Sequence, residues 1–241
     1  MKYNFRKSFC STLVLAILLF TLSIELIAQQ ESQGIRTIYL IRHGEYAPAD
    51  DNIPDSLNKL TPLGIAQARM VSSRLKAMNI KFNSLISSTM MRAKQTAMVI
   101  NEDLPGLKLL QSDLIRECTP PSWRKDVMAG VDTTEREACV QNLDKAFQKY
   151  FTPSPDEENR NDIIVCHGNV IRYFVTKVLK VDTMAWLQMS ISNCSLTIVR
   201  IYPDRHMKLV AFSDAGHIPP NMQTETGGEN KLKELIIHQN R

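Results

Sequence analysis

Several patterns that identify common classes of protein are missing from this sequence. It has no Cys-x-x-Cys pair, no run of lysine and arginine with interleaved aromatic residues, and no internal repeat or low-complexity block. The first absence argues against a structural zinc site, and the second against a nucleic-acid partner. The chain has 241 residues, of which 44% are hydrophobic and 22% charged. It can therefore bury the core of one domain, and it does not have the composition of a disordered chain.

Apart from one segment near the amino terminus, the chain also lacks an apolar run that approaches the length of a membrane span. That segment, residues 1–28, carries three basic residues among its first seven and continues into an apolar block at residues 13–20. This order is typical of a signal peptide, with cleavage expected near Ala28. The alternative is an uncleaved membrane anchor, which the charge of Glu25 disfavours. We therefore expect an exported protein, periplasmic or extracellular, that touches a membrane only through residues 1–28 if these are retained.

Cysteine is scarce in the rest of the chain. Cys10 lies in the leader, and Cys118, Cys139, Cys166 and Cys194 follow. An even number permits disulfides in an exported protein, but the spacing is not that of a small scaffold held together by them. Cys166 falls in an apolar run and is expected to be a small buried side chain. We expect no essential disulfide.

Two short apolar runs each end in a His-Gly pair. Residues 38–41 lead through Arg42 into His43, and residues 163–166 lead into His167, with glycine next in both cases. Apolar runs of this length are typical of strands buried on both faces of a parallel sheet. Because open α/β sheets bind ligands where their parallel strands end, both histidines can face one crevice. The alternative is that each histidine belongs to an unrelated loop.

Helix and strand patterns alternate along the rest of the chain. Thr61 and Pro62 suit the cap and first position of a helix, and Ser88 or Thr89 can cap another. Helices are expected from residue 62 to 78 and at 91–101, 132–151 and 170–179, and further strands at 84–87, 107–111, 195–202 and 208–212. Together these elements predict an α/β fold, a single three-layer domain at residues 35–222 with a mostly parallel central sheet flanked by helices. Residues 223–241 are expected to form a peripheral tail.

Four cationic or polar side chains, Arg42, His43, Arg92 and His167, can surround one anion. Phosphate suits them because guanidinium groups match its oxygens, and charge-assisted hydrogen bonds contribute about 1.5–3 kcal/mol each. Neutral imidazole is also a competent nucleophile toward phosphorus. Cleavage of a monoester further needs a proton for the leaving oxygen, and Glu117 is the candidate acid if its pKa is raised. The alternative is that Arg92 and Glu117 are ordinary surface residues.

Four segments together resemble the successive motifs of the histidine phosphatase (phosphoglycerate-mutase-like) superfamily. They are residues 40–45 (LIRHGE), 60–68 (LTPLGIAQA), 87–97 (SSTMMRAKQTA) and 165–168 (VCHG). Within the superfamily, residues 81–83, 114–117 and 169–173 look most like the mitochondrial protein Ser/Thr phosphatases. The resemblance implies a phosphoglycerate-mutase-like fold and catalysis without a metal or any other cofactor.

The resemblance also implies a role for each candidate residue. His43 is the expected nucleophile, which becomes phosphohistidine, and Glu117 is the expected proton donor to the leaving oxygen. Arg42, Arg92 and His167 are expected to bind the phosphoryl oxygens and to stabilise their charge during transfer. His217 lies near the end of the resemblance and is treated as a loop histidine.

We therefore expect a metal-independent phosphatase of phosphate monoesters, whose substrate is a phosphorylated small molecule or a phosphoprotein carrying phosphoserine or phosphothreonine. One alternative is a phosphoglycerate-type mutase, although residues 45–48 lack the asparagine that relatives commonly carry there. Another is a phosphate-binding module without turnover, against which the presence of both His43 and Glu117 argues. The sequence does not predict an oligomeric state.

Overall fold

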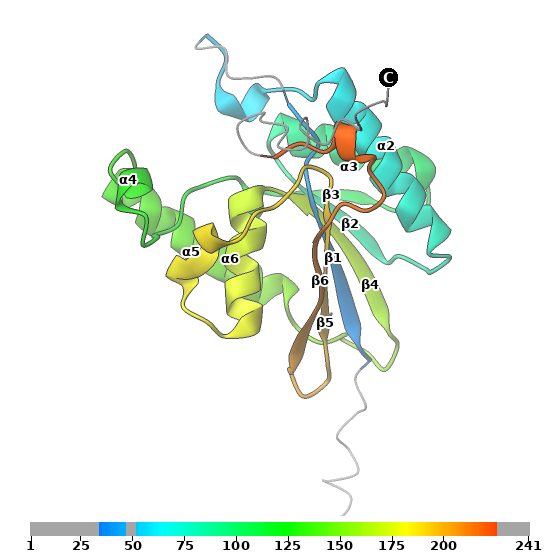
Figure 1. The fold of residues 1–241 in the computed structure, drawn as a ribbon. Helices are drawn as coiled ribbons and strands as arrows, with labels where there is room; N and C mark the ends of the chain where they lie inside the picture. Colours follow the sequence, from blue (N-terminus) through cyan, green and yellow to red (C-terminus); the bar gives the residue numbers. More distant parts are fainter. Residues whose placement is uncertain (1–33, 47–51, 226–241) are drawn as a thin grey trace, which may run out of the picture.

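The centre of the protein is a six-stranded mixed sheet. The structure, a computed structural model, describes residues 34–46 and 52–225. The strand order is β3-β2-β4-β1-β5-β6 (Figure 1). The strands are β1 (Arg36–Arg42), β2 (Ser84–Ser88), β3 (Leu109–Ser112), β4 (Arg160–Cys166), β5 (Leu196–Ile201) and β6 (Met207–Asp214). β1 to β4 run parallel, and β5 and β6 form an antiparallel hairpin. The predicted mostly parallel sheet is confirmed, and the carboxyl ends of four strands meet at one edge.

Helices cover both faces of this sheet, which confirms the predicted three layers. α2 (Pro62–Ala77) and α3 (Met91–Asp103) lie on one side, and α5 (Thr133–Tyr150) and α6 (Gly168–Leu179) lie on the other (Figure 1). A single short turn, α4 (Lys125–Met128), precedes α5, and 3₁₀ turns occur at Asp55–Leu57, Asp113–Ile115, Thr183–Gln188 and Pro220–Met222.

The composition of β1 shows why the sheet is central. Ile38 and Leu40 pack in the cluster with α5 and α6, whereas Tyr39 and Ile41 pack in the cluster with α2 and α3. Successive side chains of a strand point to opposite faces, so a strand covered on both faces is apolar throughout. Complete burial of such a side chain contributes about 1.5–3 kcal/mol. His43, the polar residue that follows β1, therefore lies where the strand ends and the helices no longer cover both of its faces.

The start of α2 confirms the predicted cap and holds the loop that follows β1. The Thr61 side chain accepts a hydrogen bond from the Gly64 amide at 3.0 Å, and Pro62 occupies the first helical turn. The Glu45 carbonyl accepts from the Thr61 amide at 3.0 Å. A Cβ atom at Gly64 would lie 1.9 Å from the same carbonyl oxygen. Glycine is therefore needed for the helix to approach this loop.

Two local predictions need correction. The cap of α3 is Met90, without a side-chain hydrogen bond, rather than Ser88 or Thr89. The Ser88 hydroxyl accepts a hydrogen bond from the Met90 amide at 3.3 Å, but it also hydrogen-bonds to His167. Ser88 therefore does not act as a simple helix cap. β3 begins at Leu109, later than the predicted 107, because residues 104–107 form a turn after α3.

Two of the cysteines form a disulfide that their spacing did not indicate. Cys118, which follows β3, is bonded to Cys139 on α5, with Cα atoms 5.7 Å apart. The pairing depends on α5 packing against the segment after β3, and this is a tertiary contact rather than a local pattern. Cys166 and Cys194 are free and buried, as expected for Cys166.

Some predictions fall outside the part of the chain that the structure describes. These concern residues 1–28 and nearly all of the tail at 223–241. The tail and the domain limits of 35–222 stay predictions. Among the helices formed by residues 34–46 and 52–225, none has the length and hydropathy of a membrane-spanning segment.

Candidate active site

The two strand-ending histidines lie side by side, as the sequence predicted. His43 follows β1, His167 follows β4, and the His43 amide donates to the Cys166 carbonyl at 3.0 Å. Their ring centroids are 5.1 Å apart, and both rings are buried. The parallel pairing of β1 with β4 thus places two imidazoles in one crevice at the carboxyl edge of the sheet.

The hydrogen bonds of His43 determine which nitrogen is free to react. Nδ1 lies 2.8 Å from the Gly44 carbonyl, which can only accept, so Nδ1 carries the proton. Nε2 then keeps its lone pair, and it accepts from Arg92 Nε at 3.3 Å. Burial, with the charges of Arg42 and Arg92, lowers the pKa of His43 well below its usual value. His43 is therefore a neutral imidazole with Nε2 turned toward the arginines.

Both candidate arginines are buried at this edge. Arg42, the last residue of β1, is 4% exposed, and its Nη1 donates to the Ile191 carbonyl at 2.5 Å. Arg42 Nε has no hydrogen-bond partner among the described residues. It points toward the start of α6, where a Cβ atom at Gly168 would lie 3.4 Å away. A buried guanidinium nitrogen without a partner costs free energy, which an anion in the crevice would offset.

Arg92 lies in the first turn of α3 and is 2% exposed. Its Nη1 and Nη2 face the two carboxylate oxygens of Asp55 at 3.3 and 3.2 Å, and Nη1 also donates to the Asp55 carbonyl at 2.9 Å. The Tyr46 ring covers the guanidinium, with its centroid 4.5 Å from Cζ. Arg92 therefore already holds an anionic group in the forked geometry that suits a phosphoryl group.

His167 has one nitrogen engaged and one free. Its Nε2 shares a hydrogen bond of 2.8 Å with the Ser88 hydroxyl at the end of β2. Its Nδ1 has no hydrogen-bond partner in the described part of the chain and lies 4.0 Å from Glu117 Oε2. Burial, together with the positive charges of Arg92 and Arg42, lowers its pKa well below the usual value. His167 also caps α6, so the free amides of that helix face the same space.

Glu117 reaches the site from the segment after β3. Its side chain is 25% exposed, and Oε1 has no hydrogen-bond partner among the residues described. Burial raises the pKa of Glu117 to about 7, against the opposing charges of Arg42, Arg92 and Arg172. A pKa in this range leaves a substantial fraction of the carboxyl group protonated near neutral pH, as a proton donor requires.

The same three residues could in principle hold a metal ion. Ligand atoms of His43, Glu117 and His167 lie within 4.8 Å of one another. However, the charges of Arg42 and Arg92 act on all three groups. Two buried guanidinium groups oppose a cation and favour an anion. The charge of the site therefore matches a phosphoryl group better than a metal.

Sequence reasoning located the five main groups but missed three of their neighbours. Tyr46, Asp55 and Ser88 contact Arg92 or His167 directly. Only Ser88 had a usable signal, since it ends a predicted strand next to the other two strand ends. His217 hydrogen-bonds to Arg74 and to the Cys194 carbonyl rather than to any of the five groups, in agreement with its treatment as a loop histidine.

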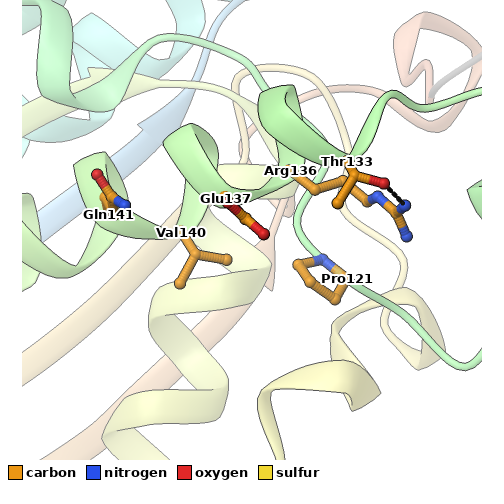
Figure 2. Close-up of a pocket in the computed structure, with 6 residues that line it drawn as sticks. All are labelled: Pro121, Thr133, Arg136, Glu137, Val140 and Gln141. Carbon is orange, nitrogen blue, oxygen red and sulfur yellow. Dashed lines mark hydrogen bonds between the residues drawn. The ribbon is translucent and has the colours of Figure 1, made fainter.

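A separate groove lies over the first turns of α5 (Figure 2). It has a volume of about 440 Å³ and is lined by Pro121 and by side chains of α5 from Thr133 to Gln141. It contains none of the candidate catalytic residues, although Pro121 belongs to the segment that follows Glu117.

The fold and the site together define a phosphoryl-binding α/β protein with two imidazoles at adjoining strand ends. The sequence matches the histidine phosphatase superfamily (branch 1) over residues 38–152 and 145–214. The chain belongs to this superfamily, as its motifs predicted.

Curated relatives and solved structures agree with this assignment. The chain is 36% identical to the mitochondrial serine/threonine-protein phosphatase Pgam5 of Caenorhabditis elegans over 82% of this chain and 69% of that protein. It is 32% identical to human PGAM5 over 81% and 68% of the two chains. A phosphoglycerate mutase from Plasmodium falciparum has 27% identity and a TM-score of 0.55, and covers 77% of this chain and 95% of its own. A mutant phosphoserine phosphatase from Entamoeba histolytica superposes with a TM-score of 0.53 at 19% identity, covering 76% and 100%, and supports the fold.

The relatives contradict one prediction. Those from Caenorhabditis elegans and human are both named as mitochondrial proteins, so the prediction of an exported protein with a signal peptide is wrong. A basic start followed by an apolar block is shared by several kinds of amino-terminal segment, and this composition alone does not distinguish their destinations.

Proposed function

We propose that this protein is a metal-independent phosphatase that hydrolyses phosphoserine and phosphothreonine in proteins through a phosphohistidine on His43. The observation that carries the proposal is the lone pair of His43 Nε2, held in a buried crevice with Arg42, Arg92 and His167. A neutral, oriented imidazole among fixed cationic groups is suited to attack a phosphoryl group whose charge those groups stabilise. The names of the relatives supply the class of substrate.

In the first step, the phosphoryl group binds among the arginines and His43 Nε2 attacks phosphorus in line with the ester oxygen. An N–P bond forms, the P–O ester bond breaks, and Glu117 donates its proton to the departing alkoxide. The Nε2 lone pair is consumed, so the Arg92 Nε–H that it accepted is free to turn to a phosphoryl oxygen. Arg42 Nε and His167 Nδ1, which lack partners among the described residues, can face the same oxygens.

In the second step, Glu117 is a carboxylate and can accept a proton from water. The water attacks phosphorus, the N–P bond breaks, and inorganic phosphate leaves with His43 restored. Glu117 regains its proton and the cycle closes. One carboxyl group acts first as acid and then as base, for which a pKa of about 7 is suitable.

The test uses purified protein in the presence of a chelator. Phosphoserine and phosphothreonine peptides are compared with sugar phosphates and nucleotides, and the protein is quenched in alkali for mapping of phosphohistidine by mass spectrometry. We expect turnover of the peptides and a phosphoryl group on His43. The His43→Ala variant should lose turnover but still bind phosphate, whereas the control His206→Ala, in the exposed β5–β6 turn, should behave like the wild type. Undiminished hydrolysis by His43→Ala would refute the nucleophile assignment.

A mutase is the second candidate, because of the similarity to the Plasmodium falciparum phosphoglycerate mutase. In that reaction the phosphohistidine returns its phosphoryl group to a sugar acid instead of to water. Residues 45–48 contain none of the asparagine that relatives commonly carry there, and this favours the phosphatase. Phosphoglycerate with a bisphosphorylated activator separates the two: isomer formation supports a mutase, and free phosphate supports a phosphatase.

A further inference from the structure

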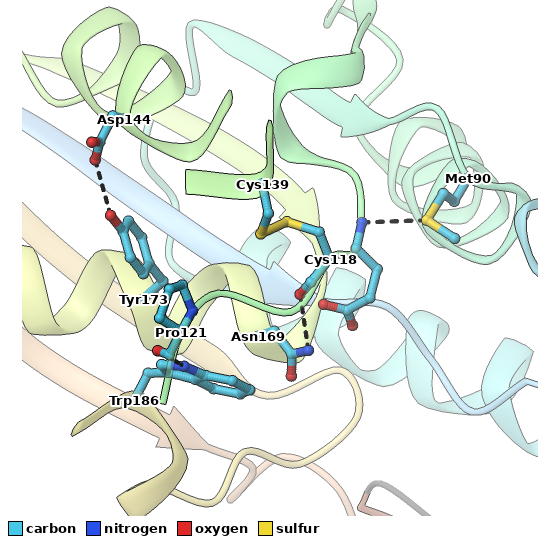
Figure 3. Close-up of a disulfide and its surroundings, with 9 residues drawn as sticks. Met90, Cys118, Pro121, Cys139, Asp144, Asn169, Tyr173 and Trp186 are labelled. Atoms are coloured by element: carbon cyan, nitrogen blue, oxygen red, sulfur yellow. Dashed lines mark hydrogen bonds between the residues drawn. A yellow bond between two sulfur atoms is a disulfide. The ribbon is translucent and has the colours of Figure 1, made fainter. Parts of the chain in front are cut away.

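We propose that the Cys118–Cys139 disulfide, together with Asn169, positions Glu117 for proton transfer, and that reduction of this disulfide selectively lowers activity on esters with poor leaving groups. The inference rests on the proposed function, because it concerns the acid of that reaction. Cys118 directly follows Glu117 in the chain, and its partner Cys139 is a buried residue of α5. Figure 3 shows the disulfide joining this helix to the loop that carries Cys118.

The Glu117 carboxyl group has few contacts of its own, and the main one is a hydrogen bond that it accepts from the Asn169 backbone amide. Oε1 has no hydrogen-bond partner in the described part of the chain, and the nearest group to Oε2 among the ion pairs is His167 Nδ1 at 4.0 Å. The Glu117 amide faces only a weak acceptor, Met90 Sδ, at 3.3 Å. Residues 117–122, which we call the Glu117 segment, form neither helix nor strand. The position of the carboxyl group therefore depends on this one hydrogen bond and on the contacts that anchor the main chain of the Glu117 segment to α5 and α6.

The Glu117 segment has three anchors, and the disulfide is the covalent one. The Cys118 carbonyl accepts from Asn169 Nδ2 at 3.0 Å. The Pro121 carbonyl accepts from Trp186 Nε1 at 2.9 Å. Both contacts are visible in Figure 3. Cys118 thus carries two of the three anchors, one through its sulfur to α5 and one through its carbonyl to α6.

The second anchor connects the acid to the histidine that it faces. Asn169 lies in the first turn of α6, the helix that His167 caps. Its Oδ1 accepts from Arg172 Nη2 at 2.7 Å, and Arg172 in turn stacks over the Trp186 ring at 4.8 Å. The amide orientation of Asn169 is therefore fixed, with its Nδ2 directed at the Glu117 segment. Cys118 is therefore fixed between two helices. Its carbonyl is bonded to Asn169 on α6, and its sulfur is bonded to Cys139 on α5.

Loss of the disulfide removes the covalent restraint on the residue adjacent to the acid, while the nucleophile and the arginines keep their own supports on β1 and α3. A displacement of about 1 Å at a catalytic group can reduce a rate by roughly 100-fold. Hydrolysis of an alkyl phosphate, which needs a proton on its leaving oxygen, should therefore become slower. Hydrolysis of a nitrophenyl phosphate should not become slower, because its leaving group departs without protonation.

The test compares kcat/KM for a phosphoserine peptide with kcat/KM for p-nitrophenyl phosphate. In the Cys118→Ser/Cys139→Ser variant we expect the first to fall at least about tenfold and the second to change less than about threefold. Dithiothreitol should produce the same selective loss in the wild type, with thiol formation followed by mass spectrometry, and should have no effect on the double serine variant. Retained nitrophenyl phosphatase activity shows that the variant is folded, and the reductant arm needs no variant at all.

A double-mutant cycle with Glu117→Gln separates positioning from general support of the fold. If the disulfide acts through Glu117, removing the disulfide from the Glu117→Gln variant should not lower kcat/KM for the phosphoserine peptide any further. Equal losses on both substrates, or additive losses in the cycle, would overturn the inference while leaving the proposed function standing. A wild type that forms no phosphohistidine and hydrolyses neither substrate would instead refute the proposed function, and the inference with it.

Discussion

The pH dependence of catalysis is a direct consequence of the position of Glu117. Burial raises the pKa of this carboxyl from 4.5 to about 7, so at pH 7 the protonated fraction is roughly 100-fold larger than for an unperturbed carboxyl. Above pH 7 the acid form declines about tenfold per pH unit. The reaction of a phosphoserine peptide should decline with it, because the alkoxide cannot leave without a proton.

The assay is the ratio of kcat/KM for a phosphoserine peptide to kcat/KM for p-nitrophenyl phosphate, measured from pH 5.5 to 9. The ratio largely cancels the ionisation of the phosphoryl group and of His43, which both substrates share, and isolates the leaving-group proton. We expect it to be constant at low pH and to fall above about pH 7. In Glu117→Gln it should be lower by about 100-fold or more at pH 6 and no longer change with pH. A falling limb that persists in Glu117→Gln, or one that begins near pH 5, would refute this reasoning.

Two further predictions concern the walls of the site. Asp55→Asn removes the carboxylate that pairs with Arg92 and should strengthen competitive inhibition by inorganic phosphate. Because Asp55 is 54% exposed, the increase in affinity should be small, about two- to fivefold. Weaker inhibition would show instead that Asp55 orients Arg92. Gly64→Ala places a Cβ 1.9 Å from the Glu45 carbonyl and should cost at least about 2 kcal/mol in urea unfolding. Its matched control, Gly106→Ala, has open space at the Cβ position and should change stability little, so equal stabilities of the two variants would contradict the close approach of α2.

The parts of the site that the sequence predicted are those fixed by strand order. Arg42, His43 and His167 each end or follow a buried apolar strand, and parallel strands place their carboxyl ends at the same edge whatever the details of the loops. Arg92 was predictable for the same reason, since it opens the helix after β2. Periodicity and strand direction therefore sufficed to gather these groups.

The parts that the sequence did not predict depend on contacts between irregular segments. Asp55 reaches Arg92 from a loop whose path no local pattern sets, and Cys118 meets Cys139 only because α5 packs beside the segment after β3. The raised pKa of Glu117 likewise results from burial by neighbours distant in the chain. Export was wrongly predicted for a different reason, because the composition of residues 1–28 does not specify a destination.

The site contains three buried polar atoms without hydrogen-bond partners among the described residues, and this connects its stability to its function. Arg42 Nε, His167 Nδ1 and Glu117 Oε1 are buried and have no hydrogen-bond partners within the described ranges, and each such atom costs about 1–3 kcal/mol in the folded protein. These atoms come from β1, from the start of α6 and from the Glu117 segment, so no single element could have relaxed to satisfy them all. A phosphoryl group presents acceptor oxygens to the first two and an ester oxygen to the third. The free energy that these groups cost the empty protein is therefore available for binding the charge that develops during phosphoryl transfer.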